Sequence, residues 1–98
     1  MGRDHNDAIE AARTWIRAIG GHVWVTHQSG RLAGSAGIPD LCFVAPDPDG
    51  VWRFAFLEIK VGRDRLSPAQ IGFRESVARA GIHVVVGTVG DAIDWLGY

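Results

Sequence analysis

A tight turn between two apolar runs is the feature that most constrains the fold of this chain. The runs IPDLCFVA, residues 38–45, and VWRFAFLEIK, residues 51–60, are rich in β-branched and aromatic residues, which favour strands. Between them, the Pro-Asp-Gly segment at 48–50 suits a type I turn followed by a glycine bulge. The sequence therefore predicts an antiparallel hairpin in which Asp47 faces Val51.

This hairpin determines which side chains face one another across the two strands. The numbers of facing residues sum to 98, so Asp40 lies opposite Glu58. The Cβ atoms of facing residues lie about 5 Å apart, and two carboxylates placed in this way repel unless a cation lies between them. Lys60, two residues after Glu58, lies on the same face of the strand. Because burying charges costs free energy unless they are paired or bind something, we expect a polar ligand at this face.

The segments before the hairpin predict a helix, a strand and a loop. Apolar residues at helical spacing with charged residues beside them predict a helix over residues 4–19. The alternating segment HVWVTHQ, residues 22–28, predicts a strand, and the glycine- and serine-rich segment 29–37 predicts a mobile loop.

The segments after the hairpin predict two helices around one strand. Residues 67–80 predict a helix with Ser67 as its N-cap, proline in its first turn and Gln70 at its third position. Residues 82–88 form the most apolar run, which predicts a central strand, and residues 90–97 predict a closing helix. The order α-β-β-β-α-β-α predicts an α/β fold with a mixed sheet flanked by helices, since the helix between the third and fourth strands permits a parallel crossover.

Length and composition exclude several classes of protein. A chain of 98 residues corresponds to one domain, residues 1–98, and no apolar run is long enough to span a bilayer. The N-terminal residues do not resemble a signal peptide, so we expect a cytoplasmic protein. Cys42 is the only cysteine, which excludes a disulfide framework within one chain, and the four histidines lack the spacing of a zinc site. Nine of the ten basic residues are arginine, and the exception is Lys60.

The sequence resembles the nuclease motif PD-(D/E)XK. Its first part corresponds to Pro39 and Asp40, and its second part to Glu58, Ile59 and Lys60. In chain order, GIPDL, LEIK, RLSPAQ and AGIHVVV resemble the VRR-NUC family of that superfamily, and the resemblance covers roughly residues 8–96. It implies a restriction-endonuclease-like core and a divalent-metal-dependent endonuclease acting on branched DNA such as four-way junctions. It also implies a homodimer similar to Holliday-junction resolvases, in a family whose small members are viral or bacterial.

The chemistry of phosphodiester hydrolysis suits these residue types. Asp40 and Glu58 are hard oxygen ligands for Mg²⁺ or Mn²⁺, with the backbone carbonyl of Ile59 and waters completing the coordination. Lys60 is placed to orient or deprotonate the attacking water and to offset negative charge. The motif therefore predicts one metal-dependent catalytic site.

Two further residues have both a functional and a structural interpretation. The resemblance aligns Glu10 with the acid of the family's first helix, which reaches the metal directly or through water; alternatively, it is a solvated residue paired with Arg13 or Arg17. Gln70 corresponds to a glutamine beside the family's active site, and it is also the residue that a capping box with Ser67 requires.

The expected loops carry three candidate DNA-binding residues, Arg31, Arg63 and Arg65, which could bind phosphates or be ordinary solvated arginines. Two other functions stay open. A non-catalytic nucleic-acid-binding or assembly module would keep the nuclease fold without cleavage, although every motif position is filled. A restriction-like enzyme that reads duplex sequence would need a recognition insert, which so short a chain does not offer.

Overall fold

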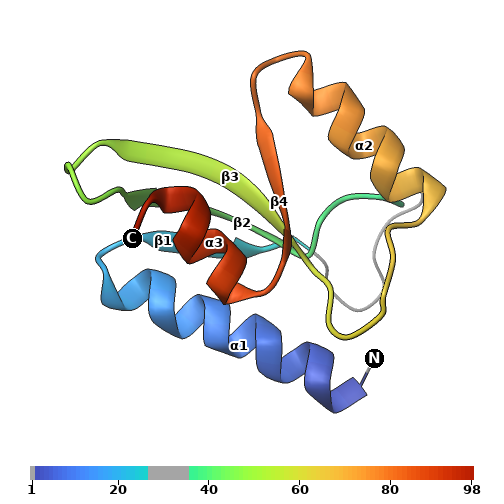
Figure 1. Ribbon diagram of the computed structural model, residues 1–98, viewed down its shortest axis with the longest axis horizontal. Helices are drawn as coiled ribbons and strands as arrows, with labels where there is room; N and C mark the ends of the chain where they lie inside the picture. Colours follow the sequence, from blue (N-terminus) through green and yellow to red (C-terminus); the bar gives the residue numbers. More distant parts are fainter. Residues whose placement is uncertain (1, 27–35) are drawn as a thin grey trace.

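A four-stranded sheet carries helices on both of its faces (Figure 1). The computed structural model describes residues 2–26 and 36–98. Its elements are α1 (Gly2–Ala18), β1 (His22–Val25), β2 (Leu41–Pro46), β3 (Trp52–Ile59), α2 (Pro68–Ala78), β4 (His83–Gly87) and α3 (Val89–Leu96). The predicted element order and α/β class are confirmed. Most of the predicted loop, including Arg31, lies outside the described residues.

The hairpin of β2 and β3 forms in the predicted register. Leu41 faces Leu57 along the ladder, which places Asp40 opposite Glu58 one position beyond it. In the turn, the Asp47 amide donates to the Val51 carbonyl at 2.8 Å, and the glycine at position 50 adopts a φ of 84°. Local turn chemistry therefore sets the alignment of the two acids.

The main core lies between one face of the sheet and the helices α1 and α3. The side chains of odd-numbered residues in β2 and β3 point to this face. They pack against Ala12 and Ile16 of α1 and Leu96 of α3, which have almost no exposed surface. None of the described helices is long and apolar enough to cross a membrane.

The opposite face of the sheet is only partly covered, by α2. Phe73 of α2 makes an edge-to-face contact with Phe56 of β3, their ring centroids 5.2 Å apart. Further along this face, Trp24, Trp52 and Phe54 remain 54%, 55% and 40% exposed. The uncovered part of this face is therefore aromatic and open to solvent.

The prediction that residues 82–88 form a central strand is wrong. β4 is an edge strand, paired in parallel with β3 only, and β2 and β3 are the inner strands. The apolar composition of β4 has another cause, because α3 contacts one of its faces and α2 the other. Burial on both faces produces an unbroken apolar run whatever the position of the strand in the sheet.

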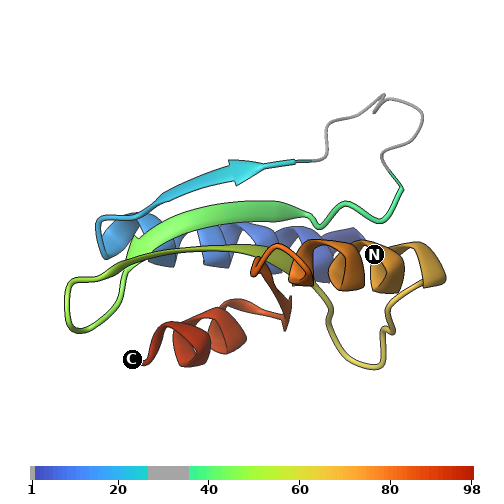
Figure 2. The same cartoon turned by 90° about the horizontal axis from the view of Figure 1, so that it is seen from above.

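The polar ends of the strands gather at one end of the sheet. Both views place the first turn of α1 and the connection after β3 at this end, whereas the hairpin turn lies at the opposite end (Figures 1 and 2). The register of β3 with β4 continues past the strand, since the Lys60 amide donates to the Gly87 carbonyl at 2.8 Å.

Gly37 allows the segment leading to Asp40 to pass close to the first turn of α2. Its φ is 89°, and a Cβ added there would lie 2.4 Å from the Ala69 carbonyl oxygen. We expect Gly37→Ala to lower the free energy of unfolding by about 3 kcal/mol, through backbone strain and this steric conflict together. Denaturant unfolding measures the change.

The matched control is Gly62→Ala. Gly62 also has a positive φ, 61°, but no atom lies within 4 Å of its added Cβ. Only backbone strain, about 1 kcal/mol, is expected there. Equal losses for the two variants would contradict a role for close packing at Gly37.

Candidate active site

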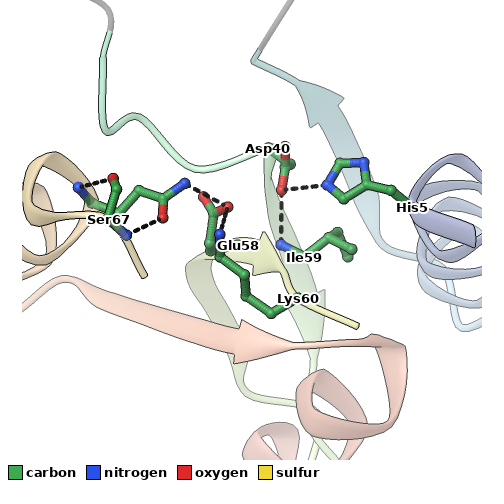
Figure 3. A network of polar contacts seen from close by, with 7 residues as sticks. His5, Asp40, Glu58, Ile59, Lys60 and Ser67 are labelled. Carbon is green, nitrogen blue, oxygen red and sulfur yellow. Dashed lines mark hydrogen bonds and ion pairs between the residues drawn. The ribbon is translucent and has the colours of Figure 1, made fainter. Parts of the chain in front are cut away.

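Two carboxylates meet where β2 begins and β3 ends (Figure 3). Asp40 immediately precedes β2, and its Oδ2 accepts a hydrogen bond from the Ile59 amide at 2.8 Å. Glu58, the facing residue, is 4% exposed, and the side chain of Asp40 is 13% exposed. The hydrogen bond to the backbone of β3 holds the Asp40 carboxylate beside that of Glu58.

The Glu58 carboxyl is in an unfavourable place for a negative charge. Burial and, next, the charge of Asp40 raise the pKa of Glu58 to about 7, although Lys60 partly opposes this shift. The Lys60 Nζ lies 3.8 Å from Oε2 of Glu58. The other oxygen, Oε1, is buried and has no hydrogen-bond partner among the described residues. A buried acid that has an unsatisfied oxygen, and whose pKa is raised even with Lys60 nearby, indicates a candidate functional site.

Gln70 joins the start of α2 to this acid. Its side-chain oxygen accepts from the Ser67 amide at 2.8 Å, while its own backbone amide donates to the Ser67 hydroxyl at 3.2 Å, so the predicted capping box is present. Its side-chain nitrogen simultaneously donates to Oε2 of Glu58 at 3.1 Å. The two interpretations of Gln70 are therefore compatible, since the capping box orients the amide that contacts Glu58.

Glu10 is not brought into this group. Its carboxylate pairs with Arg13 at 3.0 Å, and its side chain is 65% exposed. The reason is the helical position. Ile9 and Ala12 of α1 face the core, and Glu10 lies about 100° around the helix from Ile9, toward solvent. The structure thus shows Glu10 in the solvated pair that was the alternative interpretation.

A residue that sequence reasoning missed, His5, takes a place beside Asp40. Its Nε2 lies 3.4 Å from Oδ2 of Asp40, and its side chain is 19% exposed (Figure 3). One signal could have found it. His5 precedes Ile9 by four residues and Ala12 by seven, so it continues the apolar face of α1 toward the polar end of the sheet.

The predicted DNA-binding arginines lie at the rim or outside the described chain. Arg63 and Arg65 are exposed in the connection that follows Lys60. Arg31 lies outside the described residues. Ile59, whose backbone carbonyl we expected to bind metal, contributes its amide to Asp40 and buries its side chain in the core.

The residues present fit Mg²⁺ or Mn²⁺. Asp40 and Glu58 offer hard carboxylate oxygens, and the orphaned Oε1 of Glu58 is the kind of atom that a cation would satisfy. Within residues 2–26 and 36–98, no group of three or more His, Cys, Asp or Glu side chains could hold a metal ion by itself. This is compatible with Mg²⁺, which usually takes one or two carboxylates and keeps several waters.

Comparisons with known proteins agree with this architecture. The chain matches the VRR-NUC domain family over residues 8–91. A solved structure described as a VRR-NUC domain is 28% identical, covers 97% of this chain with 95% of its own length, and superimposes with a TM-score of 0.69. No curated protein matches the chain.

The fold and the acids at its strand ends define a nuclease-type α/β domain. The chain belongs to the VRR-NUC family.

Proposed function

We propose that this protein is a divalent-metal-dependent endonuclease that hydrolyses phosphodiester bonds in DNA. The observation that carries the proposal is Glu58, a buried carboxyl with an orphaned oxygen beside Asp40 and Lys60. Such an arrangement costs stability in the free protein, and it is useful where a cation binds. Membership of a nuclease-type family supports the same function.

Each residue of the site has a role in this reaction. Asp40 and Glu58, with the Ile59 carbonyl and waters, would hold Mg²⁺ or Mn²⁺, which supplies Lewis-acid stabilisation of the charge that develops on the phosphate. Lys60, held near Glu58, orients the attacking water and offsets negative charge. Gln70 fixes the orientation of the Glu58 carboxylate through its hydrogen bond.

The proposed substrate is branched DNA, such as a four-way junction. The exposed Arg63 and Arg65 lie in the connection directly after Lys60, where they can contact backbone phosphates and position the duplex without reading its sequence. Contacts to phosphates carry no sequence information, so they suit a small domain that selects DNA by its structure. The resemblance to a family with small viral and bacterial members favours the cytoplasm of a bacterial or phage-infected cell as the place of this activity.

A homodimer would present two such sites to one branch point, and the open aromatic face is the surface that we assign to the second copy. Trp24, Trp52 and Phe54 are exposed there. His22 stacks between the two tryptophans, with centroid distances of 6.4 Å and 6.3 Å. None of these four residues is a lysine or arginine, so the patch lacks the positive charge that nucleic acid requires and favours an apolar partner.

Light-scattering mass of the wild type and of Trp52→Glu tests this assignment of the aromatic face to a second copy. A monomeric wild type would contradict it.

The central test combines metal binding with cleavage. Calorimetric titration with Mn²⁺ should show saturable binding that Asp40→Asn weakens at least about tenfold, because a charged ligand is removed. Cleavage of labelled four-way junctions, flaps, splayed arms and plain duplex in Mg²⁺ or Mn²⁺ should be lost in the same variant.

Asp49→Asn is the matched control, since Asp49 is an exposed acid in the hairpin turn at the far end of the sheet. Its metal affinity and activity should equal those of the wild type. If the wild type binds neither metal, the endonuclease proposal fails and a non-catalytic nucleic-acid-binding module takes its place.

A further inference from the structure

We infer that His5 is a positioning residue of the proposed site: it holds the Asp40 carboxylate in place from the side of α1 and does not itself bind the metal. The inference rests on the proposed metal-dependent function and goes beyond it, because nothing in the nuclease motif gives this histidine a role. The observation behind it is the contact of Nε2 of His5 with Oδ2 of Asp40, at an ion-pair distance of 3.4 Å. Both side chains are largely buried.

The packing of α1 brings the imidazole to this place. His5, Ile9, Ala12 and Ile16 follow one another at intervals of four, three and four residues, which is one stripe of a helix. Ala12 and Ile16 are fully buried, and Ile9 packs against the same core. Because the buried residues fix the rotation of α1 about its axis, its first turn presents His5 to the strand ends.

The contacts that hold Asp40 fall on one of its two carboxylate oxygens. Oδ2 accepts a hydrogen bond from the Ile59 amide at 2.8 Å and faces Nε2 of His5 at 3.4 Å. An imidazole nitrogen can present an N–H to a carboxylate, and a second positive hydrogen beside the same oxygen opposes rotation of the carboxylate. Neither contact uses the other oxygen, Oδ1. The pair therefore orients Asp40 so that Oδ1 is left for a ligand.

Glu58 is held in the same manner by residues on its own side of the site. Its Oε2 accepts from the Gln70 side chain at 3.1 Å and lies 3.8 Å from Nζ of Lys60, whereas its Oε1 has no partner among the described residues. Partners of this kind orient the ligands of a metal site, and their loss commonly weakens metal affinity by about 10–100-fold. His5 serves Asp40 as Gln70 serves Glu58.

His5 is not a third ligand of this site. Within residues 2–26 and 36–98, no group of three or more His, Cys, Asp or Glu side chains could hold a metal ion. Figure 3 shows His5 approaching Asp40 from α1, with Glu58 on the other side of Asp40. The effect of His5 on the site therefore passes through Asp40.

Amide hydrogen exchange tests the inference in the metal-free protein. The Ile59 amide donates to Asp40, so its exchange rate reports how firmly that carboxylate is held. His5→Leu, which keeps an apolar side chain but removes the nitrogen, should speed exchange of this amide at least about threefold. His5→Gln, which restores a side-chain N–H donor, should stay close to the wild type. The Lys60 amide donates to the Gly87 carbonyl instead, and as the internal reference its exchange should not change.

Calorimetric titration with Mn²⁺ gives a second readout. His5→Leu should lower the affinity for Mn²⁺ about tenfold, and His5→Gln should recover most of it. In Asp40→Asn, adding His5→Leu should cost much less, because His5 acts through Asp40 and the two losses are then not additive. Asn6→Leu, an exposed change at the next position of α1, is the matched control and should keep the affinity of the wild type.

Two results would overturn the role of His5 and leave the nuclease proposal intact. The first is a His5→Leu variant with the Ile59 exchange rate and the Mn²⁺ affinity of the wild type. The second is an equal loss in His5→Leu and His5→Gln, which would indicate packing of α1 and not a contact with Asp40. A wild type that binds no Mn²⁺ overturns the proposed metal site and this inference together. Should His5→Leu fail to fold, as thermal unfolding followed by circular dichroism shows, His5→Ala replaces it in both measurements.

Discussion

Lys60→Ala is expected to lower the rate of DNA cleavage at least about 100-fold, while the fold and Mn²⁺ binding persist. The reason is that the Lys60 ammonium is held near Glu58, at 3.8 Å from Oε2, where it can orient water and compensate charge in the transition state. Alanine removes these contributions without removing a carboxylate ligand. Single-turnover cleavage at saturating metal measures the effect on the chemical step, and calorimetry measures metal affinity.

Arg63→Ala is the control for general loss of positive charge. Arg63 lies three residues further along the same connection and is exposed. Its loss should weaken DNA binding and change the single-turnover rate at saturating DNA by only a small factor. If Lys60→Ala cleaves like the wild type, Lys60 has no part in the chemistry.

Glu58→Gln is expected to stabilise the metal-free protein at pH 8 by about 3 kcal/mol and to abolish metal-dependent cleavage. The pKa of Glu58 is about 7 in the folded protein and 4.5 as its ordinary value. The folded state therefore binds more protons than the unfolded state between these values, and stability falls as pH rises from about 4.5 to about 7. Glutamine keeps the shape of the side chain and removes this penalty.

Denaturant unfolding at pH 5 and pH 8, with a chelator present, measures this effect. The wild type should lose stability between the two pH values, and Glu58→Gln should lose much less. Glu75→Gln, an exposed change on α2, should keep the pH dependence of the wild type. A wild type that is equally stable at both pH values would mean that Glu58 is not a strained acid.

Metal should reverse the penalty, because a cation favours the ionised carboxylate. Binding stabilises the folded state by an amount that grows with metal concentration, about 2.7 kcal/mol at 100 times the dissociation constant. Under the proposed function, the protein keeps a destabilising acid in the metal-free state because the same acid would bind the metal. This trade between stability and activity is common at catalytic sites.

Gln70 illustrates how one residue can serve the fold and the site together. Its oxygen and backbone amide close the capping box of α2, and its side-chain nitrogen contacts Glu58. The start of α2 is consequently tied to the orientation of a proposed metal ligand. Structural and functional interpretations of such a residue need not compete.

The sequence by itself determined the features that depend on neighbours in the chain. The Pro-Asp-Gly turn and strand alternation predicted that Asp40 faces Glu58, and the spacing of Ser67 and Gln70 predicted the capping box. Tertiary structure decided what depends on packing between distant segments. It placed β4 at the edge of the sheet, turned Glu10 to solvent and brought His5 to Asp40. The rotation of α1 results from burial against elements far away in the sequence, and β4 is an edge strand because it pairs with β3 alone; local spacing encodes neither.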